Sequence, residues 1–132
     1  SCAMIGRTEA EFYHAQLVRQ FGGATGLRDP GILDASLKRP FATFGGEDLF
    51  PTAFDKAAAM MHGIITGHPF IDGNKRTGYQ LGRLLLQEGG YDVEASEDER
   101  YAMVIRAASG QMEVEDIKAW LTDHSMAYRK EG

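Results

Sequence analysis

One stretch in the middle of the chain reads His68-Pro69-Phe70-Ile71-Asp72-Gly73-Asn74-Lys75-Arg76-Thr77. A histidine can move a proton near neutral pH, and an aspartate can hold a hard cation such as Mg²⁺. The Asp72-Gly73-Asn74 turn can aim backbone N–H groups at an anion. Lys75 and Arg76 follow, and an apolar helical pattern begins directly behind them. The stretch therefore combines a base, a metal ligand, an anion cradle and positive charge between two predicted helices.

The two cations are the strongest sign that this stretch is a site. Lys75 and Arg76 fall in the first turn of the predicted helix, where positive side chains oppose the helix dipole. A bound anion would reverse that penalty, because free N–H groups at a helix start attract negative charge. Phe70 is a large apolar residue inside a polar loop, and we expect it to enter the core and anchor the loop.

Each residue also has an ordinary interpretation when it is taken alone. His68 could be a loop histidine with its hydrogen bonds satisfied, and Asp72 could form a common turn with Gly73 or cap the next helix. Lys75 and Arg76 could form a solvated surface. These interpretations do not explain why all the residues fall in one segment, so we favour a site.

Other kinds of site have weaker support. The histidines, His14, His62, His68 and His124, do not have the spacing of metal ligands. The sequence contains neither a phosphate-binding P-loop nor the nucleophile elbow of serine hydrolases.

The sequence on either side of the central stretch predicts mainly helices. Capping residues, three- and four-residue apolar spacing and glycine stops predict helices from Thr8 to Gly22, Asp29 to Pro40, Thr52 to Gly67, Asn74 to Gly89, Ser96 to Gly110, and over 114–121. Residues 41–51 place Gly45-Gly46 between aromatic residues, which indicates an irregular loop or a small hairpin. Residues 91–93 read as extended. The sequence therefore predicts an all-α bundle of about six helices.

Composition limits the classes of function. A chain of 132 residues suits one domain over 1–132, with residues 1–6 disordered or a cloning remnant and 122–132 a frayed tail. Its net charge of −5 argues against broad nucleic-acid binding. Cys2 is the only cysteine, which excludes an intrachain disulfide and fits the cytoplasm. We expect no membrane span, because no apolar run is long enough.

The run from His68 to Arg76 resembles the signature of the Fic/Doc family, His-x-Phe-x-Asp/Glu-Gly-Asn-Gly/Lys. The likeness extends over residues 8–121 and includes segments 26–31, 36–40, 43–51 and 107–110. The branch that transfers AMP usually has glycine directly after the asparagine and a second arginine five positions after it. Lys75 and Tyr79 occupy those positions here, and Asn-Lys-Arg is similar to the Doc pattern.

The resemblance implies a function. Doc-type proteins are similar in fold to AMP transferases but present the γ-phosphate of ATP and act as protein kinases. They are toxins of toxin–antitoxin modules, and translation factor Tu is the known kind of target. The resemblance therefore implies a toxin that phosphorylates a protein hydroxyl and blocks translation. Two alternatives stay open, a Fic-type nucleotidyl transferase and a non-catalytic relative that only binds a partner.

The resemblance also implies a role for each residue of the loop. His68 would be the general base, Asp72 would bind Mg²⁺ on the nucleotide, and Phe70 would anchor the loop. Gly73 and Asn74 would bind phosphate through the backbone and the asparagine side chain, while Lys75 and Arg76 would bind phosphate and neutralise charge on the transferring group. For Arg83, a salt bridge is favoured over a replacement of the missing arginine.

Partners are implied in the same way. Segment 41–51 resembles the family's flap, which pairs with a target by strand addition, so Phe44, Gly45, Gly46 and Phe50 are candidate docking residues. Both phenylalanines could equally pack on the body. Self-inhibited relatives carry Ser/Thr-x-x-x-Glu-Gly/Asn, and neither Ser109 to Val114 nor Thr43 to Asp48 completes that pattern. We therefore expect inhibition by a separate antitoxin whose helical C-terminal segment folds on binding.

Overall fold

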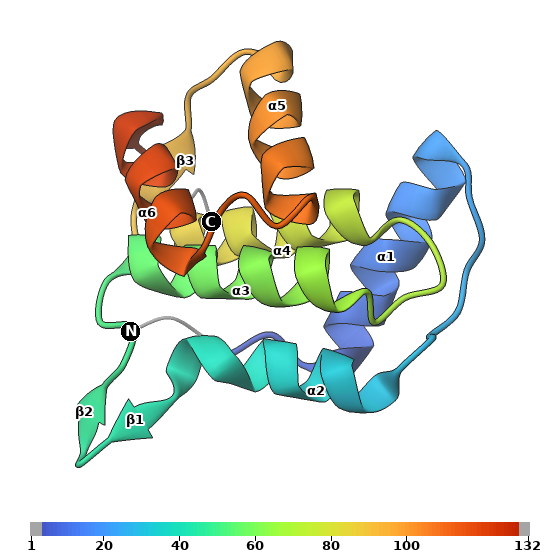
Figure 1. Ribbon diagram of the computed structural model, residues 1–132, viewed down its shortest axis with the longest axis horizontal. Coiled ribbons are helices and arrows are strands. Elements are labelled where there is room, and N and C mark those ends of the chain that lie inside the picture. Colours follow the sequence, from blue (N-terminus) through green and yellow to red (C-terminus); the bar gives the residue numbers. More distant parts are fainter. Residues whose placement is uncertain (1–3, 130–132) are drawn as a thin grey trace.

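The computed structural model describes residues 4–129 and is mainly helical there (Figure 1). It confirms the predicted all-α fold. The helices are α1 (Arg7–Phe21), α2 (Pro30–Lys38), α3 (Ala53–Gly67), α4 (Asn74–Glu88), α5 (Glu97–Ala108) and α6 (Val114–Asp123), with a 3₁₀ turn at Arg39–Phe41. The strands are β1 (Thr43–Phe44), β2 (Glu47–Asp48), β3 (Tyr91–Val93) and β4 (Ser125–Ala127). None of the described helices combines the length and apolar character needed to cross a bilayer.

Helix starts largely follow the sequence. The predicted caps at Asp29, Thr52 and Ser96 each accept a hydrogen bond from the backbone N–H three residues later, at 3.1 Å. For α1, the sequence pairs Thr8 with Glu11, three residues later, as a capping box, and this prediction is wrong. The helix begins at Arg7, and the Gly6 N–H donates to the Glu9 carboxylate at 3.2 Å.

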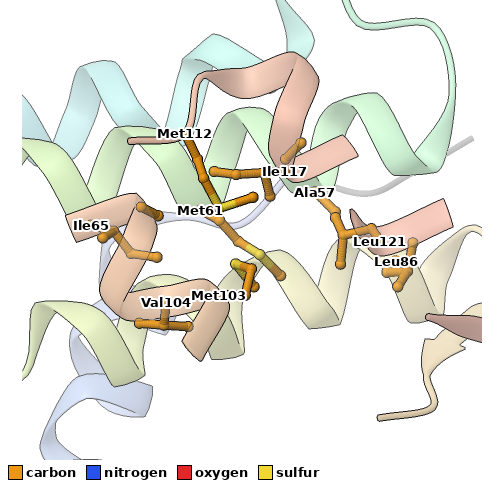
Figure 2. Close-up of a cluster of buried hydrophobic side chains, with 11 residues drawn as sticks. Ala57, Met61, Ile65, Leu86, Met103, Val104, Met112, Ile117 and Leu121 are labelled. Carbon is orange, nitrogen blue, oxygen red and sulfur yellow. The ribbon is translucent and has the colours of Figure 1, made fainter. Parts of the chain in front are cut away.

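Helix α3 lies at the centre of the molecule and is buried on two faces. One face joins a core cluster with α4, α5 and α6, and Figure 2 shows Met61 and Ile65 on this side with Met103 and Ile117. The other face, which carries Met60 and Ile64, joins a second cluster with α1, α2 and α4. Such burial is expected for α3, because a helix that is apolar nearly all round is buried within a domain.

Close packing between α3 and α4 fixes the two helices that flank the loop. A Cβ added at Gly82 would lie 2.4 Å from Met61, and one added at Gly78 would lie 2.8 Å from Ile65. Only glycine at these two positions, one turn apart, lets the helix surfaces approach this closely. The connecting loop is therefore held between two rigid ends.

Both ends of the chain contradict the sequence expectation where they are described. Ile5 is buried in the core cluster of α1 and α2, so residues 4–6 are not a disordered leader. Residues 125–127 form β4, which pairs antiparallel with β3 in the register Asp92↔Met126. The expected frayed tail is thus wrong for 122–129, because the backbone of β3 supplies hydrogen-bond partners that the local sequence does not reveal. The same expectations for residues 1–3 and 130–132 lie outside the described residues.

The 41–51 segment is a small hairpin. Thr43 pairs with Asp48 and Phe44 with Glu47, around Gly45 and Gly46. These glycines have φ values of 59° and 83°, which a two-residue hairpin turn requires at both central positions. The hairpin interpretation is therefore confirmed, and the irregular-loop alternative is wrong.

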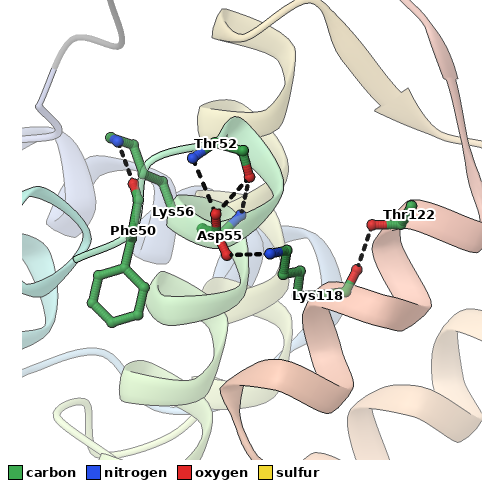
Figure 3. A network of polar contacts seen from close by, with 6 residues as sticks. All are labelled: Phe50, Thr52, Asp55, Lys56, Lys118 and Thr122. Atoms are coloured by element: carbon green, nitrogen blue, oxygen red, sulfur yellow. Dashed lines mark hydrogen bonds and ion pairs between the residues drawn. The ribbon is translucent and has the colours of Figure 1, made fainter. Parts of the chain in front are cut away.

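A polar network ties this hairpin to the body (Figure 3). The Lys56 ammonium is buried, donates to the Phe50 carbonyl and lies 3.7 Å from an Asp48 carboxylate oxygen. Beside it, the buried Asp55 carboxylate accepts from the Thr52 hydroxyl at 2.8 Å and pairs with Lys118 at 2.9 Å. Helix α6, the start of α3 and the hairpin are thereby joined through two neighbouring residues of α3.

Replacing Asp55 with asparagine is expected to destabilise the protein by roughly 1.5 to 3 kcal/mol at neutral pH, since charge-assisted hydrogen bonds are lost. Burial raises the pKa of Asp55, but the hydrogen bonds from Lys118 and Thr52 outweigh it, so the pKa lies below 3.8. The stabilisation is therefore complete above pH 3.8 and is lost as the pH falls through the lower folded value. Urea unfolding at several pH values measures it.

The matched control is Asp34→Asn, which removes an exposed ion pair with Arg7 at 3.9 Å. Its effect should stay below about 1 kcal/mol. Equal losses in the two variants, or a loss at Asp55 that does not shrink in acid, would contradict the assignment.

Candidate functional site

The central loop begins where α3 ends. His68 follows the last helical residue with φ 51° and ψ 55°, and it is the one non-glycine residue with a left-handed backbone in the part of the chain described. Its side chain is exposed, whereas Pro69 behind it is buried. A left-handed histidine costs about 1–3 kcal/mol and persists only where its surroundings hold it. Strain of this kind clusters at functional sites.

Phe70 anchors the loop in the core, as predicted. It is 1% exposed, and its ring stacks on the buried His14 ring with centroids 3.9 Å apart and planes 8° apart. His14 Nε2 also lies 2.7 Å from the Asp72 carbonyl oxygen. His14 was not among the residues predicted for the site, and the only local signal for an inward-facing residue was its place four residues after Ala10, on the same side of the predicted helix.

Asn74 is buried and locks the loop from inside. Its amide oxygen accepts from the Phe70 N–H at 2.9 Å, and its amide nitrogen donates to the Phe70 carbonyl at 3.0 Å. The side chain therefore satisfies two buried backbone groups and shapes the turn. This differs from the expectation that the side chain holds a phosphate.

A segment that sequence analysis did not assign to the site runs beside the loop. The Ile71 N–H donates to the Gly26 carbonyl at 3.0 Å, and the Ala24 N–H donates to an Asp72 carboxylate oxygen at 3.3 Å. The N–H groups of Arg28 and Asp29 both donate to the Pro69 carbonyl. The loop thus has an ordered backbone partner along its outer edge.

The start of α4 offers an anion site. Gly73 is the N-cap with φ 76°, and no side chain caps the helix. Asn74, Lys75 and Arg76 are the first three helical residues, and the first backbone N–H groups of a helix have no partner within it. Asp72 does not cap α4; one of its carboxylate oxygens accepts from the adjacent Gly73 N–H at 2.8 Å. The predicted placement of both cations in the first turn is confirmed.

These residues line a groove of about 550 Å³, a volume typical of small-molecule sites. One wall is the run from Asp72 to Arg76, and Leu17 and Phe21 of α1 adjoin it. The facing wall comes from α4 and α5: Tyr79, Gln80, Glu97, Asp98, Arg100, Tyr101 and Val104. His68 is at the other end of the loop and does not line the groove. A second hollow, of about 390 Å³, lies along α1 and contains no residue of the loop.

Cations dominate the loop side of this groove. Lys75 and Arg76 are exposed, and the Arg76 guanidinium lies 4.3 Å above the centre of the half-exposed Phe21 ring. Stacking on an aromatic face fixes a guanidinium without using its N–H donors. Those donors therefore stay available to a phosphate.

Asp72 is the one loop residue suited to a divalent cation. Its carboxylate is exposed, and no group of three or more potential metal ligands exists within residues 4–129. A dedicated protein cage is therefore not formed by this part of the chain. A single carboxylate does fit Mg²⁺, which usually binds one or two carboxylates together with substrate phosphates and water.

Tyr79 occupies the position where the AMP-transferring branch has a second arginine, and Arg83 follows it on the same helix. Tyr79 lines the groove, and burial raises its pKa despite the opposing charges of Arg100 and Arg83, so its phenol is neutral at physiological pH. Arg83 forms a two-pronged ion pair with Asp92, at 2.7 and 3.0 Å. The salt-bridge interpretation of Arg83 is thereby confirmed.

The hairpin lies far from the loop. It adjoins the start of α3, whereas His68 follows the end of α3, and Figure 1 shows the two at opposite ends of that helix. A helix of 15 residues is about 22 Å long. Phe44 is 80% exposed, while the Phe50 ring packs under Arg39 at 5.8 Å. Phe44 is therefore free to meet a partner, and Phe50 belongs to the body.

The family model described as Fic/DOC matches residues 7–86, which include α1 to α3, the loop and most of α4. This chain belongs to the Fic/DOC family. The Fic/DOC match ends before α5, so it contains the loop wall of the groove and Tyr79, but not the α5 residues of the facing wall.

Two named proteins are similar to the chain. One is "Toxin Doc" of Mycolicibacterium smegmatis, 34% identical over 113 residues that cover 81% of this chain and 84% of the relative. Another is "Protein kinase doc" of Escherichia phage P1, 30% identical over 104 residues that cover 79% of this chain and 81% of the relative.

Proposed function

We propose that this protein is a Doc-type toxin of a toxin–antitoxin pair, which transfers the γ-phosphate of ATP to a hydroxyl of a target protein. The observation that carries the proposal is the uncapped start of α4 with Lys75 and Arg76 on one groove, in a loop that begins with His68. The names of the two relatives, a toxin and a protein kinase, agree with it. We propose a translation factor of the Tu type as target, in the cytoplasm.

The proposed transfer uses the residues of the loop in turn. His68 takes the proton of the target hydroxyl while that oxygen bonds to the γ-phosphorus. The bond from the γ-phosphorus to the bridging β–γ oxygen breaks, and ADP leaves. Lys75, Arg76 and the free N–H groups of α4 neutralise the charge of the transferring group.

Asp72 is the residue that would hold Mg²⁺. When bound there, the ion supplies positive charge to the nucleotide phosphates. The backbone N–H of Gly73 is engaged by Asp72, so the phosphate donors of this turn are the N–H groups of the residues that follow it.

The deciding experiment uses two ATP samples, one labelled at the γ-phosphate and one at the α-phosphate. Each is incubated with the protein, Mg²⁺ and a bacterial lysate, and labelled proteins are separated by electrophoresis. We expect transfer from the γ-position alone. Transfer from the α-position would establish the alternative, nucleotidyl transfer, despite Lys75. Transfer from neither position would favour the partner-binding alternative.

We propose that the antitoxin covers the groove. Phe21 and Tyr101 border it with 52% and 67% of their surfaces exposed, and such apolar residues suit an amphipathic helix laid into a groove. Co-expression with the neighbouring antitoxin is expected to give a complex with no transferase activity. Undiminished transfer by that complex would exclude this mode of inhibition.

A further inference from the structure

Arg28 binds the backbone of the loop at the point where α3 ends. Its guanidinium donates to the His68 carbonyl at 2.6 Å and to the Gly67 carbonyl at 2.7 Å. Its own backbone N–H donates to the Pro69 carbonyl at 2.7 Å. A single residue, 40 positions away in the sequence, therefore holds three consecutive carbonyls.

These carbonyls are the ones that need a partner. The last carbonyls of a helix have no N–H donor within the helix, and the negative end of the helix dipole lies there. The planar guanidinium reaches two of them at once, whereas an ammonium is a single compact charge. With both carbonyls fixed on either side of its α-carbon, His68 is held in its left-handed conformation.

We propose that Arg28 is a positioning residue that fixes His68 for proton transfer. The inference rests on the proposed role of His68 as the base. Arg28 does not line the groove, and the phosphate-facing half of the loop has its own restraints in Asn74 and His14. Loss of the guanidinium therefore affects the position of the base while the phosphate site keeps its shape.

The test measures γ-phosphate transfer at varied ATP concentration with a fixed lysate. Arg28→Met is expected to lower the maximal rate roughly 10- to 100-fold, the usual cost of a misplaced catalytic group. The ATP concentration at half-maximal rate should stay unchanged. Arg28→Lys keeps the positive charge but loses the two-pronged guanidinium, so its maximal rate should lie between those of Arg28→Met and wild type. The matched control is Arg7→Met, which removes an arginine with exposed partners and should transfer at the wild-type rate.

A merely structural role would give a different result. If the loop unravelled in Arg28→Met, ATP binding would weaken together with the rate, because Asp72 to Arg76 belong to the same loop. That joint loss, or a maximal rate equal to wild type, would overturn the proposal.

A second readout does not depend on catalysis. With ¹³C-labelled histidine, the backbone Cα resonance of His68 is assigned by its absence in His68→Ala. Arg28→Met should move this resonance toward its random-coil position and leave that of His124 in place. An unmoved His68 resonance would overturn the proposal, even if wild-type protein transfers no phosphate and the proposed function itself fails.

Discussion

Replacing His68 with alanine is expected to lower γ-phosphate transfer by roughly two to four orders of magnitude, the usual contribution of a positioned general base. The imidazole is exposed at the start of the loop, so its removal leaves no buried cavity. The alanine variant should therefore fold, with an unfolding midpoint close to that of wild type. Label incorporation from γ-labelled ATP measures the loss.

The control for this prediction is another histidine. His124 stacks on Trp120 with ring centroids 4.2 Å apart and pairs with Glu99 at 3.4 Å, beyond the end of α6. His124→Gln should transfer label at the wild-type rate. If His68→Ala were as active as His124→Gln, the loop would not act through a base at this position, and the partner-binding alternative would gain.

Replacing Phe70 with alanine is expected to destabilise the protein by about 3–5 kcal/mol, as for other buried aromatic residues. The ring is 1% exposed and packs among Leu33, Ile64 and Leu81 as well as on His14. A domain of this size is stable by about 5–15 kcal/mol, so the variant loses a large share of its stability. Urea unfolding measures the difference, and phosphate transfer should fall with it because the loop loses its anchor.

Phe44 is the matched control, because it is also a phenylalanine but is 80% exposed at the hairpin tip. Phe44→Ala should change the free energy of unfolding by less than about 0.5 kcal/mol. A similar small change at Phe70 would mean that the loop does not depend on its core anchor.

The Phe44→Ala variant also addresses target docking. A strand added to the hairpin would adjoin the start of α3, whereas His68 follows the end of that helix, which is about 22 Å long. Docking there could recruit the target but not orient the reacting hydroxyl. We expect weaker incorporation at low target concentration and the wild-type rate at saturation, as measured with purified target.

Much of the molecule was predictable because its signals are local. The caps at Asp29, Thr52 and Ser96 and the turn at Gly45-Gly46 act within a few residues, so each could be recognised without knowledge of the rest. The loop was recognisable for the same reason, since Asp72 to Arg76 are contiguous. Phe70 was predictable because a large apolar side chain in a polar loop has few places other than the core.

The rest depended on contacts between distant parts of the chain. The side chain of Asn74 was expected to hold a phosphate, whereas its amide bonds the buried Phe70 backbone, because the sequence does not show which way an amide faces. β4 was missed because its partner strand, β3, lies some thirty residues earlier. The flanking walls of the groove come from α1 and α5, which no motif connects to the loop.

The sequence by itself determined which chemical groups the loop contains and where its two helices end and begin, because capping and turn preferences act over three or four residues. Only the tertiary structure decided how those groups are held. His14 is 58 residues from Asp72 and Arg28 is 40 residues from His68, and such pairs meet only when helices pack. Close approach of α3 and α4 fixes the two ends of the loop, and that approach requires glycine at positions 78 and 82, where a Cβ would meet side chains of α3.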